Sequence, residues 1–233
     1  MESFRKNILQ QIECIATGRI FTFRDLSFDN DKTANVAVLL SEQSKKGILV
    51  RVEKGAYYRP RKSALGLGKL PIYQDEQFRY LTEKLNGYIT GAYVYNKMGL
   101  TEQVATTITI ATCYPVRHFR FKNLDVECVK AYYSDCTNES LIPFLRLLDA
   151  IKDMKHIPGT TEQDIYNRVK TQYFSHYSVA ELKKVITLAK NYPPRVRKVV
   201  ADILGDIKQA ALQREMKKTL LPTTRFNMNY KTV

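Results

Sequence analysis

Cationic side chains gather in one short stretch of the chain, between residues 45 and 62. This stretch contains Lys45, Lys46, Arg51, Lys54, Arg59, Arg61 and Lys62. Ammonium and guanidinium groups form charge-assisted hydrogen bonds with phosphate oxygens, and such contacts position a protein on a nucleic-acid backbone. The chemistry that these residues indicate is therefore binding of a polyanion rather than a reaction.

A helix followed by a β-hairpin must position these cations. Val36, Leu39 and Leu40 have the i, i+3, i+4 spacing that builds one apolar helix face, and Gly47 can end the helix. Two short strands, 48–52 and 56–58, then flank the turn 53–55. Gln43 occupies the next position of the apolar stripe, so we expect a partly exposed last turn.

The residues upstream complete a known arrangement. Ile8, Ile12 and Ile15 predict a first helix, Ile20 and Phe21 a short strand, and residues 23–26 a second short helix after the N-cap Thr22. The order helix, strand, helix, helix, hairpin is typical of a winged helix-turn-helix, whose third helix enters the major groove of DNA. The alternative is an ordinary helix and hairpin packed in a core. The concentration of positive charge favours DNA binding over it.

The DNA-binding residues follow from this interpretation. With the apolar stripe turned inward, helical geometry directs the other side chains of the helix outward, where they can contact bases or phosphates. The predicted contact residues are Lys32, Thr33, Asn35, Val38, Ser41, Lys45, Lys46, Arg51, Lys54, Arg59, Arg61 and Lys62.

Positive charge is concentrated at the two ends of the chain, which has 233 residues and a formal net charge of +14. Residues 1–70 contain 13 Lys and Arg against 7 Asp and Glu, residues 71–180 contain 12 against 12, and residues 181–233 contain 12 against 4. A neutral middle between two basic ends suggests two surfaces that face an anion. The second such surface is expected at Arg195, Arg197 and Lys198, although a solvated basic helix face is the default interpretation.

Other kinds of site find little support. The four cysteines and three histidines are scattered without metal-ligand spacing, and no carboxylate pair or nucleophile–base arrangement converges. Gly66 and Gly68 are not followed by the Gly-Lys-Ser/Thr of a phosphate-binding loop. We therefore expect no enzyme, metal, cofactor or disulfide framework. No signal peptide or apolar run of membrane-spanning length is present, so a soluble cytoplasmic protein is expected.

The fold class expected from these patterns is α+β. An N-terminal winged helix-turn-helix (residues 1–62) precedes a mixed α/β domain with a helical C-terminal part (63–219) and a tail (220–233), which is either mobile or docked as an extended segment. Within the second domain, the alternation of Thr107–Thr112 predicts a strand, and strands 116–121 and 126–132 are expected to pair around Lys122 and Asn123. One long helix is expected from the prolines at 193–194 to about Lys218.

The chain resembles the AbiEi-type antitoxins of abortive-infection toxin–antitoxin systems over roughly residues 5–210. The resemblance rests on Lys54–Pro60 (KGAYYRP), on the stretch 90–104 (TGAYVYNKMGLTEQV) and on Tyr192–Arg197 (YPPRVR). It implies a phage-defence antitoxin whose winged helix represses its own operon by binding operator repeats in double-stranded DNA, with an oligomer able to form there. It also implies a partner, a nucleotidyltransferase-fold toxin encoded nearby. A stand-alone winged-helix transcriptional regulator without a toxin partner is the alternative.

Overall fold

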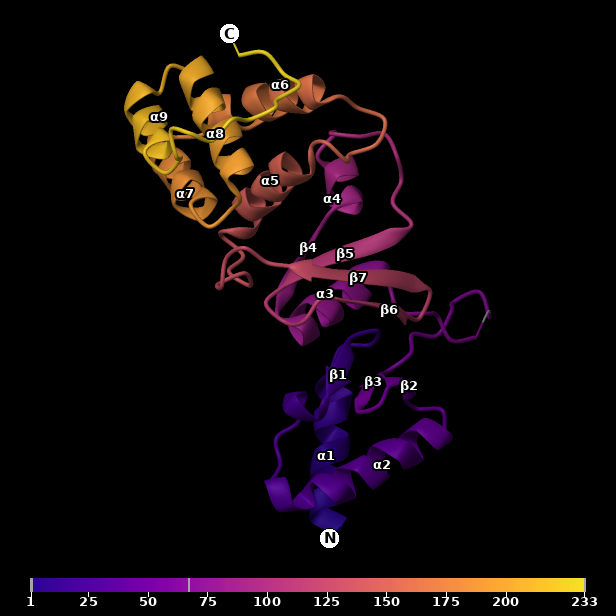
Figure 1. Cartoon of the computed structure of the whole chain (residues 1–233). Coiled ribbons are helices and arrows are strands. Elements are labelled where there is room, and N and C mark those ends of the chain that lie inside the picture. The colour runs from indigo at the N-terminus through magenta and orange to yellow at the C-terminus, as the bar shows by residue number, and fades with distance from the viewer. Residues whose placement is uncertain (1, 67, 233) are drawn as a thin grey trace. The chain divides into compact units, whose positions relative to one another are not determined.

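The computed structural model describes residues 2–66 and 68–232, and the chain has a mixed α+β structure (Figure 1). Among these residues are nine α-helices and seven strands, and the strands form two small sheets. The chain divides into two compact units, Met1–Glu83 and Lys84–Val233. The α+β class expected from the sequence is confirmed at this level.

The first unit contains the elements expected from the hydrophobic pattern. They are α1 (Glu2–Cys14), β1 (Ile20–Thr22), the 3₁₀ turns η1 (Phe23–Asp25) and η2 (Asn30–Lys32), α2 (Thr33–Lys45), β2 (Val50–Glu53) and β3 (Ala56–Tyr58). The strands form an antiparallel sheet in the order β1-β3-β2. The short second helix is a single 3₁₀ turn, because Thr22 and Asp25 form a reciprocal cap around three residues.

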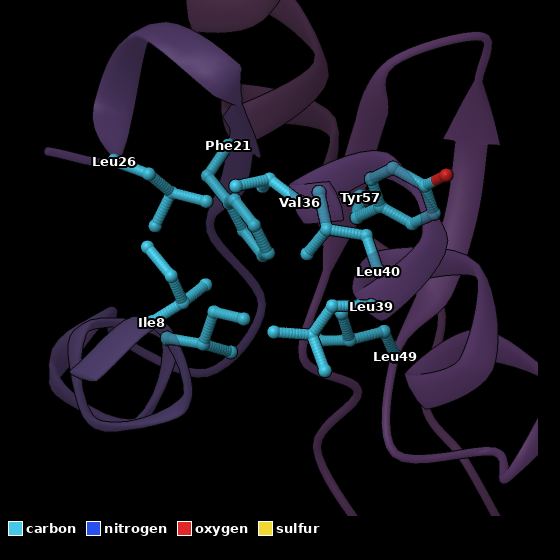
Figure 2. Packing of buried hydrophobic residues seen from close by; sticks show 9 residues of the cluster. Ile8, Phe21, Leu26, Val36, Leu39, Leu40, Leu49 and Tyr57 are labelled. Atoms are coloured by element: carbon cyan, nitrogen blue, oxygen red, sulfur yellow. The ribbon is translucent and has the colours of Figure 1, made fainter. Parts of the chain in front are cut away.

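The core of the first unit joins α1, α2 and the sheet. Figure 2 shows Ile8 from α1 and Val36, Leu39 and Leu40 from α2 pointing toward a common centre, with Phe21, Leu26, Leu49 and Tyr57 around them. The expectation for Gln43 is wrong: this residue is only 5% exposed. Its carbonyl accepts hydrogen bonds from the N–H groups of Ile48 and Leu49, which folds the chain back over the end of α2.

The first unit extends past the boundary expected at residue 62. Lys62 and Lys69 form an isolated antiparallel bridge, and the Leu70 N–H donates to the Arg61 carbonyl. The next helix, α3 (Gln74–Leu85), is tied to β1, because Glu76 accepts from the Ile20 N–H at 2.6 Å and Arg79 donates to the Ile20 carbonyl at 2.9 Å. These bonds explain why most of α3 belongs to the first unit.

The second unit begins with a four-stranded mixed sheet. Its elements are β4 (Gly87–Thr90), α4 (Ala92–Lys97), β5 (Thr107–Thr112), β6 (Arg117–Phe121) and β7 (Leu124–Lys130). The strand order is β4-β5-β7-β6, in which β5 and β7 are parallel and the other pairs antiparallel. The hairpin expected around Lys122 is confirmed, and Lys122 has the positive φ (54°) that such a tight turn requires.

Helices form the rest of the second unit and lie together in Figure 1: α5 (Ile142–Asp153), α6 (Glu162–Gln172), α7 (Val179–Ala189), α8 (Pro194–Asp206) and α9 (Ala210–Lys217), with a 3₁₀ turn η3 (Phe174–His176). Ser178 caps α7 together with Glu181, and Thr161 caps α6 together with Asp164.

The single long helix expected at the C-terminal end is wrong. The chain leaves helical geometry after Asp206, because Lys208 adopts a left-handed φ of 60°, and α8 and α9 are therefore separate helices. The tail docks as an extended segment: the Tyr230 ring stacks on Tyr166 at 4.3 Å, and its hydroxyl donates to Asp202.

A buried carboxylate links the sheet of the second unit to its helices. Asp149 on α5 is 2% exposed and accepts hydrogen bonds from the hydroxyls of Tyr88 (2.8 Å), Thr90 (2.8 Å) and Tyr192 (3.0 Å). Burial raises the pKa of this carboxyl above its ordinary value, although Lys152 and the three hydroxyls oppose the shift. Because every donor comes from another segment, the cluster fixes β4 and the residues just before α8 onto α5.

Replacing this carboxylate should destabilise the second unit. In Asp149→Ala, three buried hydroxyls lose their acceptor, so the free energy of unfolding should fall by about 3 kcal/mol. Asp153→Ala is the matched control on the same helix, since Asp153 accepts one such bond, from Tyr95, and should cost only about 1 kcal/mol. Urea unfolding followed by circular dichroism measures both. Equal losses in the two variants would contradict a special role for Asp149.

Candidate nucleic-acid interface

The outward face of α2 is uncovered by the rest of the first unit. Asn35 and Ser41 are exposed, and the Val38 side chain is 58% exposed although it is apolar. Val36, Leu39 and Leu40 on the opposite face are buried, so the helix has a fixed rotation about its axis. Along the helix this face therefore carries the amide of Asn35, the isopropyl group of Val38 and the hydroxyl of Ser41, each about one turn after the last.

The start of α2 is partly engaged within the chain. Lys32 forms an ion pair with Asp29 and lies over the Phe4 ring, 5.4 Å from its centroid. Its side-chain hydrogen bond and charge hold the pKa of Asp29 below its ordinary value. The Thr33 hydroxyl donates to the Asn30 carbonyl at 2.7 Å. These two predicted contact residues shape the turn before the helix.

The end of α2 is strongly basic. Lys45 and Lys46 are exposed, and Gly47 turns the chain with a φ of 72°. The Lys69 ammonium lies next to Gly47, close to this basic end of the helix. It is 2.9 Å from the position that a Cβ atom on Gly47 would occupy. The prediction from the sequence did not include Lys69. The flanking glycines at 66 and 68, which favour a reversal of the chain, were the available signal.

The hairpin β2–β3 carries a second group of cations. Lys54 is exposed at its turn, beside Gly55 with a φ of 79°. Arg51 is exposed on β2, although its Nε donates to the Glu53 carbonyl at 3.2 Å. Lys62 is exposed after β3. These side chains can reach a phosphate without breaking an ion pair.

Two residues predicted to contact phosphate, Arg59 and Arg61, make contacts within the first unit. Arg59 donates through Nη1 to the carbonyls of Glu13 (2.6 Å) and Ile15 (2.9 Å), which closes the C-terminal end of α1. The Arg61 guanidinium lies 3.4 Å from the centroid of the Tyr73 ring. Both are half-buried. Both side chains therefore contact other residues inside the first unit, and contact between either of them and phosphate stays a prediction.

The predicted second basic surface is also engaged internally. Arg195 pairs with Glu162, Arg197 donates to the Thr219 carbonyl, and Lys198 contacts both oxygens of Asp202 at 2.5 and 2.6 Å. Arg195 also donates to the Asn227 carbonyl at 2.9 Å, so it helps hold the tail. Exposed cations of this region include Lys183 and Lys184 on α7, and Lys217 and Lys218 at the end of α9.

Metal and membrane sites are not apparent in residues 2–66 and 68–232. Within these ranges, no three His, Cys, Asp or Glu side chains are grouped as metal ligands. The helices of the same ranges are also too short or too polar to cross a bilayer.

Comparisons with known proteins give a family but no activity. A family model described as a family of unknown function (DUF6088) matches residues 7–133, which include nearly all of the first unit and the sheet of the second. No curated protein matches the chain. The RV2827C protein from Mycobacterium tuberculosis is a similar solved structure, with 12% identity, coverage of 95% of this chain and 83% of that chain, and a TM-score of 0.41.

The free energy of unfolding should distinguish the internal hydrogen bonds of Arg59 from the exposed position of Lys54. Arg59→Ala removes two hydrogen bonds to backbone carbonyls, so the free energy of unfolding of the first unit should fall by about 2 kcal/mol. Lys54→Ala removes an exposed side chain of the same charge and should change it by less than about 0.5 kcal/mol. Urea unfolding followed by circular dichroism makes the comparison, and an Arg59→Ala protein as stable as the Lys54→Ala protein would contradict the internal role.

Proposed function

The chain belongs to the DUF6088 family, whose function is unknown, and from its own residues we propose that its first unit is a winged helix-turn-helix that binds duplex DNA. The observation that carries the proposal is the uncovered face of α2, which is followed directly by exposed lysines. In this assignment α2 is the recognition helix and the hairpin β2–β3 is the wing.

The side chains on α2 suit the edges of base pairs. An Asn side chain can form two hydrogen bonds with adenine, a hydroxyl can bond to any base, and an apolar group can contact the methyl of thymine. Asn35, Ser41 and Val38 supply one of each. An exposed valine is unfavourable in water, and a thymine methyl would cover it. We therefore expect a site that contains A·T pairs.

Lysines supply the contacts with the backbone. Lys45, Lys46, Lys54, Lys62 and Lys69 are exposed, and no ion pair is assigned to them in the described residues. Contacts between these ammonium groups and phosphates position a protein without reading sequence, and they release counterions. DNA binding of this kind is what a transcriptional repressor needs. We therefore propose that the protein represses transcription by binding repeats in its operator.

The antitoxin role is the finer part of the proposal and rests on the resemblance of residues 90–104 to AbiEi-type antitoxins. Tyr95 and Leu100 in this stretch are buried, and Thr101 donates to the Pro158 carbonyl at 2.7 Å. Its end is different: Glu102 and Gln103 are exposed, and Val104 is 85% exposed. An exposed apolar side chain in a motif that is otherwise structural suits contact with a partner protein. We propose a nucleotidyltransferase-type toxin as this partner. A regulator without a toxin remains the second candidate.

Removal of the exposed lysines should weaken DNA binding in a salt-dependent way. In Lys45→Ala/Lys46→Ala/Lys54→Ala, the slope of log affinity against log salt should flatten by roughly 0.9 for each lost phosphate contact, so by up to ~2.7. The measurement is fluorescence anisotropy with a duplex from the chain's own promoter, at several KCl concentrations.

The matched control removes the same charge from other elements. Lys6, Arg19 and Arg24 are exposed on α1, before β1 and in η1. The slope of Lys6→Ala/Arg19→Ala/Arg24→Ala should stay close to that of the unchanged protein. If both triple variants lose slope equally, binding depends on net charge alone, and the assignment of α2 and the hairpin is wrong.

Repression and neutralisation should be separable in the full chain. With the toxin expressed from an unrelated promoter, the triple lysine variant should lose repression but still rescue cells. Val104→Asp should do the reverse, because a carboxylate would be buried against the partner. Growth measures rescue, and a promoter reporter measures repression. Loss of rescue in the lysine variant would favour a regulator that acts only through transcription.

A further inference from the structure

Two thiols from distant parts of the chain lie together in the second unit. The Sγ atoms of Cys113 and Cys136 are 3.9 Å apart, although 23 positions separate the residues. Cys113 follows β5, and Cys136 lies in the segment between β7 and α5. Both are free thiols in this structure.

Surrounding backbone holds the pair in place. The Cys136 thiol donates to the Asn86 carbonyl at 3.2 Å, and Cys113 lies 3.8 Å from the Ser134 carbonyl. The N–H of Ala131 donates to the Thr112 carbonyl at 2.9 Å, which continues the parallel pairing of β5 and β7 up to the residue before Cys113. Strand pairing therefore places Cys113 next to the beginning of the segment that carries Cys136.

The two thiols differ in access. Cys113 is exposed, whereas Cys136 is 1% exposed. An oxidant in solution can therefore reach Cys113 directly, while Cys136 is positioned to react only with a group on Cys113. An accessible thiol beside a second, resolving thiol is an arrangement that suits reversible disulfide formation.

We propose that Cys113 and Cys136 are a redox modification site, at which a hydroperoxide converts the two thiols into a disulfide. In the first step the Cys113 thiolate attacks one peroxide oxygen, the O–O bond breaks, and a sulfenic acid and hydroxide form. In the second step the Cys136 sulfur attacks the Cys113 sulfur, the S–OH bond breaks, and the Cys136 proton leaves with the hydroxide as water. Two thiols are oxidised and one hydrogen peroxide is reduced to two waters.

The electrostatics agree with this order of steps. Burial, reinforced by the neighbouring Cys113, raises the pKa of the Cys136 thiol to about 11. Cys136 is therefore protonated while Cys113 reacts with the oxidant, and it must lose this proton as its sulfur attacks the sulfenic acid. Closure of the bond needs the sulfurs to approach by about 1.9 Å, since an S–S bond is about 2 Å long and the Sγ atoms are 3.9 Å apart.

The remaining cysteines provide internal references. Cys14 is exposed in the first unit, and Cys128 is fully buried on β7, paired in register with Ile110. Cys14 reports whether the oxidant reached an exposed thiol, and Cys128 should remain a thiol throughout.

The test uses the full-length protein, reduced and then treated with hydrogen peroxide. After denaturation and alkylation with N-ethylmaleimide, intact mass spectrometry should show the loss of two hydrogens and the absence of two alkyl groups. Peptide mapping should join Cys113 to Cys136, and dithiothreitol should reverse the change. Cys14→Ser should behave in the same way. Cys113→Ser should lose the change completely, and Cys136→Ser should accumulate a sulfenic acid on Cys113 that dimedone traps.

Three outcomes would overturn the proposal. Cys113 and Cys136 could both remain alkylated at a peroxide concentration that oxidises Cys14. The loss of two hydrogens could persist in Cys113→Ser. The disulfide could instead form between copies through Cys14. Because Cys113 is exposed, its serine variant should fold normally, so the result does not depend on the buried position 136.

Discussion

Burial of one apolar stripe on α2 is the constraint on which the first unit depends. Val36, Leu39 and Leu40 pack against α1 and the sheet, and this contact fixes the rotation of the helix. Once the stripe is buried, the polar side chains and Val38 must face away from the core, since a helix presents its residues at 100° intervals. The geometry of the proposed DNA-binding face is therefore a direct consequence of core packing.

Several cations of the chain are engaged in internal contacts. Three arginines hold separate segments together: Arg59 closes the end of α1, Arg79 ties α3 to β1, and Arg197 donates to the Thr219 carbonyl. A planar guanidinium with several donors suits such bonds, because it can satisfy two acceptors at once. Lysines such as Lys45 and Lys54 stay exposed instead. A net charge of +14 thus overstates the charge that a polyanion can contact.

The second unit depends on polar contacts inside its core. The Asp149 carboxylate accepts hydrogen bonds from the hydroxyls of Tyr88, Thr90 and Tyr192. The sheet and the helices therefore share a buried hydrogen-bond cluster. Networks of this kind favour one packing arrangement over others, since each misplaced element would leave a buried polar group without a partner. The same strand pairing that positions Tyr88 also brings the segment after β5 beside Cys136.

The sequence by itself determined the local elements. Apolar spacing predicted α2 and its outward residues, and the turn residues predicted the hairpin, because these signals act over a few neighbouring positions. Only the tertiary structure decided which cations are exposed, where the first unit ends and which thiols meet. The partners of those groups lie far away in the sequence: Arg59 bonds to a carbonyl 46 positions before it, and Cys113 lies beside a thiol 23 positions after it. No local pattern of residues contains such a contact, because it forms only when separate elements pack together.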